Sequence, residues 1–160
     1  MRARLLLLLS LVAPLAGCSS PHVDLRTALE IVDVSTGYFD MGVVNGQNKI
    51  VPSITYKLKN RSSVTLDVLQ TNHSFKRQGE QDEWGNGYLK VTGREGLAPG
   101  ETSRALTVRS QLGYTGLESR QKMLENQYFV DAYVRVLAKY NNAQWVEVGQ
   151  FPIARRVLEP

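Results

Sequence analysis

Side chains that commonly carry out chemistry in proteins are scarce in this chain and do not form a recognisable set. The 160 residues include two histidines, His22 and His73, and one cysteine. A zinc site needs three or four converging ligands, and His73 has no partner at ligand spacing. We therefore predict no metal and no cofactor.

Catalysis by a serine or by paired carboxylates has little support. His73 would have to meet a serine and an acid through folding, because no Gly-x-Ser-x-Gly motif is present. Glu80, Asp82 and Glu83 share one polar loop, where acids more often serve solubility than glycoside hydrolysis. The same loop lacks the alternating acids and the turn glycine of an EF-hand calcium site. We expect a protein that is not an enzyme.

Aromatic residues in loops are the better candidates for a binding role. Trp84 lies in a polar, glycine-punctuated loop directly before Tyr88, and Tyr114 is flanked by glycines. Tryptophan and tyrosine are frequent anchors at interfaces, and loops often carry recognition. Trp84, Tyr88 and Tyr114 are therefore our candidate binding residues. The alternative for Trp84 is that it folds back over the core.

The first residues have the layout of a secretory signal. Arg2 and Arg4 precede an apolar run at residues 5–15, and Cys18 follows shortly after. A helix that spans a bilayer needs about 20 apolar residues, so this run is too short to cross and instead suits a signal peptide. No later stretch approaches that length without charges, and no transmembrane segment is predicted.

The end of this run, Leu15-Ala16-Gly17-Cys18, resembles the lipobox of bacterial lipoproteins. The resemblance implies cleavage after residue 17 and a lipidated Cys18, with a diacylglyceryl thioether and an amide-linked acyl chain of the palmitate type. Two or more chains make such an anchor effectively permanent. Ser19 in place of an aspartate implies the outer membrane, facing the periplasm. The alternative is a plain secreted protein in which Cys18 is an ordinary thiol.

Charge and cysteine content limit the other possibilities. Removal of residues 1–17 leaves 143 residues and takes away two arginines, so the formal charge falls from +4 to +2. A nearly neutral surface gives no reason to expect nucleic acid, and the Arg155-Arg156 pair is interpreted as a solvated end. Residues 18–24 indicate a lipidated cysteine with a short tether of at most about 20 Å. Residues 25–160 are long enough for a single domain.

Beyond the tether, apolar residues recur with a period of two, which is typical of half-buried strands. The clearest run extends from Tyr128 to Ala138. Pro99-Gly100 and Asn141-Asn142 predict turns, and Pro152 indicates an edge strand. Seven strands are expected, at residues 26–35, 49–59, 64–76, 87–93, 103–110, 128–140 and 144–153.

One segment predicts a helix. Thr115 and Glu118 have capping-box spacing, and Leu117 and Leu124 share one face, which places a short helix at 117–125 between the fifth and sixth strands. Together these elements predict an all-β fold, an immunoglobulin-like antiparallel β-sandwich of about seven strands. A transthyretin-like arrangement of the strands is the alternative.

A second resemblance covers residues 49–110. Leu58-Lys59-Asn60 ends one predicted strand, and Leu97-Ala98-Pro99-Gly100-Glu101 forms a later turn. This pattern is similar to FxLYD-type domains, immunoglobulin-like modules of bacterial surface lipoproteins. The Phe-x-Leu-Tyr-Asp string of those domains is absent here, and the predicted helix has no counterpart in them. The resemblance implies a sandwich and supplies no catalytic residues.

Three functions follow from these observations. The first is a non-catalytic envelope lipoprotein whose sandwich binds another envelope protein or supports an assembly. The second is a glycan- or peptidoglycan-binding module that uses Trp84, Tyr88 and Tyr114. The third is an envelope hydrolase, which would need His73 in a cleft beside a serine and an acid.

Overall fold

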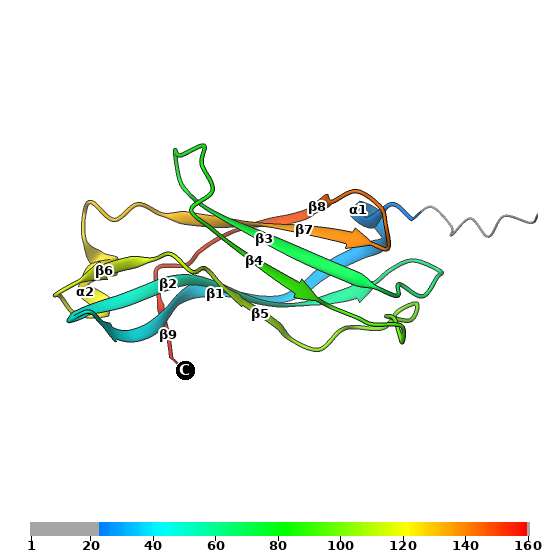
Figure 1. The fold of residues 1–160 in the computed structure, drawn as a ribbon, viewed down its shortest axis with the longest axis horizontal. Coiled ribbons are helices and arrows are strands. Elements are labelled where there is room, and N and C mark those ends of the chain that lie inside the picture. Colours follow the sequence, from blue (N-terminus) through cyan, green and yellow to red (C-terminus); the bar gives the residue numbers. More distant parts are fainter. Residues whose placement is uncertain (1–22, 160) are drawn as a thin grey trace, which may run out of the picture.

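The computed structural model describes residues 23–159 (Figure 1). The predicted signal segment, Cys18 and His22 lie outside the described residues. Within 23–159 two short helices and nine strands follow in the order α1 (Leu25–Ala28), β1 (Leu29–Val44), β2 (Gln47–Asn60), β3 (Leu69–Arg77), β4 (Gly85–Lys90), β5 (Leu106–Arg109), β6 (Tyr114–Gly116), α2 (Arg120–Glu125), β7 (Ala132–Tyr140), β8 (Val146–Pro152) and β9 (Val157–Leu158).

The strands form two facing sheets. One has the order β5-β2-β1-β9, with β6 added to the start of β2, and the other has the order β4-β3-β7-β8. Every pairing is antiparallel except that of β1 with β9. Placing β7 between β3 and β8 corresponds to the F strand between C and G of an immunoglobulin-like fold. The predicted fold class is confirmed, and the edge position of β8 agrees with Pro152.

Two long strands run the length of the molecule. β1 and β2 form a hairpin whose turn is Asn45-Gly46, and both turn residues have positive φ. Asparagine followed by glycine favours this tight turn because both tolerate the left-handed region. The expected first strand, 26–35, is therefore wrong at both ends: residues 25–28 are helical, and the strand continues to Val44.

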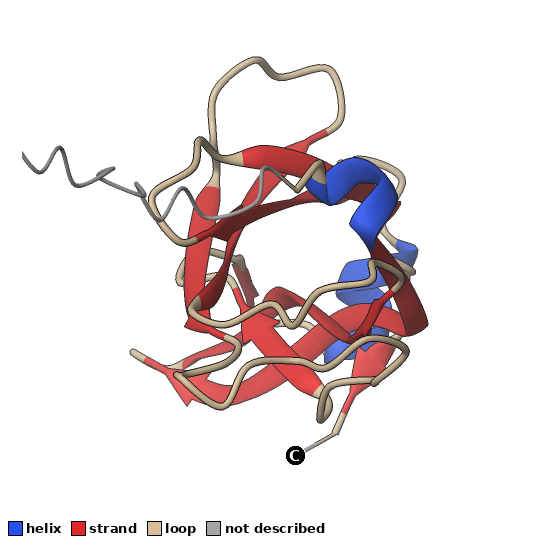
Figure 2. Cartoon of the chain, turned by 90° about the vertical axis from the view of Figure 1, so that its right-hand side faces the viewer, coloured by secondary structure: helices blue, strands red, loops and turns tan. Residues whose placement is uncertain are grey.

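Figure 2 shows the two sheets wrapped around a common axis. Side chains of alternate residues from both sheets fill the interior. The two sheets approach closely where β4 meets β5. A Cβ atom added at Gly85 would clash with Ser110, and one added at Gly87 would clash with Val108. On the opposite side, Thr36 joins β1 to the end of β8 by donating its hydroxyl to the Pro152 carbonyl at 2.9 Å.

One predicted strand begins later than expected, and two short strands were not predicted. Residues 64–68 do not belong to the strand predicted at 64–76; Leu66 forms only an isolated bridge with Leu97, and Val68 has a φ of 48°. Left-handed backbone at Val68 breaks the alternation before β3 begins. The short strands β6 and β9 were not predicted, because three and two residues carry too little periodicity to recognise.

The second helix is shorter than predicted. Its N-cap is Ser119, whose hydroxyl accepts from the Lys122 backbone N–H at 3.4 Å, so the capping box expected at Thr115 and Glu118 does not form. The expected position between the fifth and sixth strands becomes a position between β6 and β7. Leu117 lies before the helix and is 82% exposed rather than core-facing. Over 23–159, neither helix has the length and apolar composition needed to cross a bilayer.

Candidate functional site

Two of the three candidate binding residues meet in one aromatic cluster between the sheets. The rings of Trp84 and Tyr114 have centroids 4.9 Å apart, and Tyr114 lies 4.5 Å from Phe129. Tyr38, which is fully buried, contacts Phe129 edge-on at 5.2 Å. The guanidinium of Arg77 lies 5.5 Å from the Trp84 ring centroid. Trp84 is half-buried against the core, in line with the alternative that it folds back over the core.

The position of Tyr114 follows from the short strand β6. Gly113 brings this segment against β2 so closely that a Cβ atom there would clash with the Ile50 carbonyl. The Tyr114 hydroxyl then donates to the Val130 carbonyl at 2.7 Å, and burial raises the pKa of this phenol. Tyr114 therefore serves as a link between β6 and the loop that precedes β7.

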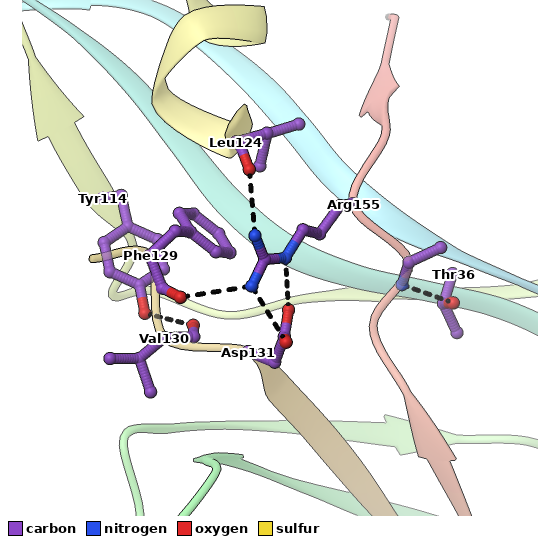
Figure 3. A network of polar contacts seen from close by, with 8 residues as sticks. Thr36, Tyr114, Leu124, Phe129, Val130, Asp131 and Arg155 are labelled. Carbon is purple, nitrogen blue, oxygen red and sulfur yellow. Dashed lines mark hydrogen bonds and ion pairs between the residues drawn. The ribbon is translucent and has the colours of Figure 1, made fainter. Parts of the chain in front are cut away.

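That loop, residues 126–131, is fixed by Arg155 from the C-terminal segment (Figure 3). The guanidinium donates to both carboxylate oxygens of Asp131, at 2.7 and 3.0 Å, and to the carbonyls of Phe129 and Leu124 at 3.2 and 3.4 Å. It also lies over the Phe129 ring. The hydrogen bonds from Arg155 lower the pKa of Asp131. Arg155 is thus a structural clamp, contrary to the solvated end expected from the sequence.

An open cavity of about 460 Å³ lies beside this loop. Its walls are largely apolar and come from β6, the start of α2 and loop 126–131, including Tyr114, Leu117, Met123, Tyr128 and Phe129. Tyr128 is 82% exposed and lies outside β7, whereas the sequence pattern had placed it at the start of the long inward-facing strand.

More exposed apolar side chains extend this region toward the tip of the β1–β2 hairpin. Arg120 of α2 pairs with Asp40 of β1 at 2.9 Å, which joins the two elements. We use the term distal end for the large exposed apolar residues gathered here, at the opposite end of the molecule from α1 (Figure 1). They are Met41, Val43, Val44, Leu117 and Tyr128.

Tyr88 does not join the aromatic cluster. It lies on the outer face of the β4-β3-β7-β8 sheet, is 56% exposed and forms an edge-to-face pair with Trp145, with centroids 6.4 Å apart. Trp145 was not a predicted site residue, although its place between the Asn141-Asn142 turn and the edge strand β8 favours exposure. The structure therefore divides the three candidates between two surfaces.

His73 is a core residue. It is fully buried, its Nε2 lies 2.9 Å from the Tyr56 hydroxyl, and its Nδ1 lies 3.1 Å from the Gly87 carbonyl. Burial lowers the pKa of His73 to about 4. Neither hydrogen-bond partner is a serine or an acid, so the arrangement that a hydrolase would require is not formed around this side chain. Residues 23–159 contain no group of three potential metal ligands.

Comparison with known proteins adds little to this description. No protein family and no curated protein matches the chain. Among solved structures, the putative ApaA protein from Bordetella pertussis aligns with 79% of this chain and 93% of its own, at 19% identity and a TM-score of 0.47. A second structural-genomics target aligns with 82% of this chain and 89% of its own, at 14% identity and a TM-score of 0.47.

Proposed function

We propose that the protein is a non-catalytic lipoprotein of the bacterial envelope, anchored through acyl chains on Cys18, whose sandwich presents its distal end to an envelope protein partner. The observation that carries this proposal is the separation of the two ends. The described chain begins beside α1, and β6 and α2 lie at the other end (Figure 1), next to the exposed apolar residues Leu117 and Tyr128.

The length of β1 sets the scale of this separation. Its 16 residues connect α1 to the distal hairpin and, at about 3.3 Å per residue, correspond to roughly 50 Å. The residues between Cys18 and the domain add at most about 20 Å. A lipid anchor at Cys18 would therefore hold the tether end near the bilayer and direct the distal end into the periplasm.

The chemistry of the distal end favours a protein partner. Val43, Leu117 and Tyr128 expose 65%, 82% and 82% of their surfaces, and a cavity of about 460 Å³ with apolar walls lies beside the last two. Clustered exposed apolar side chains beside a concavity are typical of protein interaction sites. The buried state of His73 gives no support to the hydrolase alternative.

Site-specific photo-crosslinking in cells tests the partner. A crosslinker at position 128 should capture a defined partner, and one at position 61 near α1 should not. Leu117→Ser in the position-128 protein should abolish the product, while Leu112→Ser, a matched change at another exposed leucine, should retain it. Equal products at positions 128 and 61 would contradict a partner at the distal end.

The anchor is tested separately. Mass spectrometry of protein from the membrane fraction should find Cys18 as an acylated first residue, and Cys18→Ser should release the protein into the soluble fraction. An unmodified thiol at Cys18, in protein that leaves the cells freely, would refute the lipoprotein assignment without bearing on the fold.

A further inference from the structure

The outer face of the β4-β3-β7-β8 sheet has an ordered set of side chains that the distal end does not use. The strand register places Lys90, Gln70 and Lys139 in one row across three strands. The next row contains Tyr88, Asn72 and Leu137. Adjacent strands lie about 4.8 Å apart, so the two lysines flank the glutamine with Cα atoms about 10 Å apart.

Two aromatic rings stand over these rows. Tyr88 and Trp145 form an edge-to-face pair and keep 56% and 37% of their surfaces exposed. Lys139 places its ammonium 5.8 Å from the Trp145 ring centroid. Both rings come from edge strands or their ends and lean over the two central strands. The result is a ridge of aromatic surface above polar side chains.

The polar groups under the ridge are available for a ligand. Gln70 and Asn72 are half-buried, and within residues 23–159 their side-chain amides form no hydrogen bond. Neither Lys90 nor Lys139 forms an ion pair with another described residue. Glu147, the carboxylate on this face, is already paired with Arg135. The face therefore offers two cations, two amides and two rings.

We propose that this face binds an acidic oligosaccharide of the envelope. The apolar faces of sugar rings pack on exposed Tyr and Trp, sugar hydroxyls exchange hydrogen bonds with the amides, and carboxylates pair with Lys90 and Lys139. The inference rests on the proposed envelope location and adds a ligand class and a second surface. On this surface the residue beside Tyr88 is Trp145, and neither Trp84 nor Tyr114 takes part.

Two other anionic ligands fit this face less well. Recognition of an anionic bilayer surface usually needs a cluster of about four or more cations, and the described residues of this face offer two unpaired lysines. Single-stranded nucleic acid usually needs a groove with more cations than the two lysines here. An acidic glycan supplies both the hydroxyls and the widely spaced charges that these side chains can recognise.

Tryptophan fluorescence tests the proposal at the site itself. The chain has two tryptophans, so Trp84→Phe leaves Trp145 as the reporter. Full-length Trp84→Phe protein in non-ionic detergent is titrated with hexameric oligogalacturonate and with neutral chitohexaose. We expect the acidic sugar to cause a saturable change in Trp145 emission. The neutral sugar should bind at least about tenfold more weakly, and the difference in affinity between the two sugars should grow as the salt concentration falls.

Variants separate this face from the rest of the surface. In the same background, Lys90→Gln with Lys139→Gln should weaken binding by about tenfold and flatten its salt dependence, and Tyr88→Ala should weaken it by about tenfold. Lys122→Gln and Tyr128→Ala, at the other end of the molecule, serve as matched controls and should bind as the parent does. Circular dichroism confirms that each variant is folded.

Several results would overturn the proposal. The first is no change in Trp145 emission on adding the acidic sugar, and the second is an affinity that the lysine substitutions leave unchanged. The third is equal affinity for the neutral sugar. The fourth is a higher affinity for oligothymidylate or for phosphatidylglycerol vesicles than for the acidic sugar. Because the titration does not involve Cys18 or the distal end, a negative result leaves the anchor and the protein partner standing. Conversely, if the Cys18 anchor is refuted, binding of the acidic sugar to this face would still be expected.

Discussion

His73 and Tyr56 join the two sheets through a polar contact inside the core. Tyr56 belongs to β2 and His73 to β3, and the Nε2–hydroxyl distance is 2.9 Å. Burial raises the pKa of Tyr56 to about 12 and lowers that of His73 to about 4. Both groups are therefore neutral at neutral pH, which is the state that a buried pair favours.

The lowered pKa predicts that acid destabilises the fold. Between pH 6.5 and 4 the unfolded chain binds a proton at His73 that the folded chain does not, so stability falls as the pH decreases through this window. A shift from 6.5 to about 4 corresponds to a loss of up to about 3 kcal/mol. Urea unfolding at pH 7, 5 and 4 measures it. His73→Gln should remove most of this dependence, and a His22→Gln control should keep it.

The glycines of β4 give a second prediction for single residues. Gly87 faces β5, where a Cβ atom would clash with Val108, so Gly87→Ala should destabilise the fold by about 1–3 kcal/mol. Thermal unfolding measures the change. Combining it with Val108→Ala should cost less than the sum of the two single changes, because the shorter side chain makes room. Strict additivity would mean that the two residues do not contact.

At the scale of elements, loop 126–131 depends on a side chain from far along the chain. Arg155 holds the Phe129 carbonyl and the Asp131 carboxylate, and Tyr114 holds the Val130 carbonyl (Figure 3). The loop in turn forms one wall of the distal cavity. A substitution of Arg155, which does not line this cavity, should therefore change the cavity's shape through the loop.

Arg155→Ala should loosen this loop rather than unfold the protein. Amide hydrogen exchange at residues 126–131 is expected to become about tenfold faster, since several hydrogen bonds to half-exposed groups are lost together. Arg155→Lys should give an intermediate rate because one ammonium cannot reproduce the planar fork. Arg61→Ala, which removes an exposed ion pair with Glu30, is the control. Unchanged exchange in Arg155→Ala would contradict the clamp.

Strand alternation was sufficient to predict the fold class and the central strands. The run of buried residues at every second position from Ala132 to Ala138 is the same in the sequence and in the structure. The β1–β2 hairpin was missed although Asn45-Gly46 is a strong turn signal, because two register shifts, at Val32/Ser35 and at Asp40/Val43, interrupt the alternation along β1. Irregular pairing therefore hides a strand from periodicity.

The candidate sites were less predictable because they depend on long-range contacts. The sequence suggested Trp84, Tyr88 and Tyr114 as one set of candidates, yet Trp84 lies just before β4 and packs on Tyr114, whereas Tyr88 lies within β4 and is exposed on the outer face. Its partner Trp145 comes from the other edge of the same sheet. The exposure of Leu117 follows from a helix that begins at Arg120, after the N-cap Ser119, rather than at residue 117, and a short capping motif does not determine this start.

For the whole molecule, α1 and the distal end lie at opposite ends of a long axis, so the proposed anchor predicts an upright orientation on the membrane (Figure 1). Energy transfer to an acceptor dye in the bilayer should be strong from a fluorescent amino acid at position 61 and weak from one at position 128. In Cys18→Ser protein, transfer should disappear from both positions. Strong transfer from position 128 would mean that the sandwich lies flat.

On each open side of the sandwich the two sheets touch at a few residues, through the close approach of β4 to β5 and through the Thr36 contacts with Pro152 and Ala154. Unpaired strand edges are where identical chains add to one another and begin to form fibrils. Membrane-tethered molecules are concentrated in two dimensions, where neighbours meet constantly. The proposed anchor would place this protein in such a layer, and the side chains that cover part of its sheet edges would hinder strand addition between neighbours at those positions.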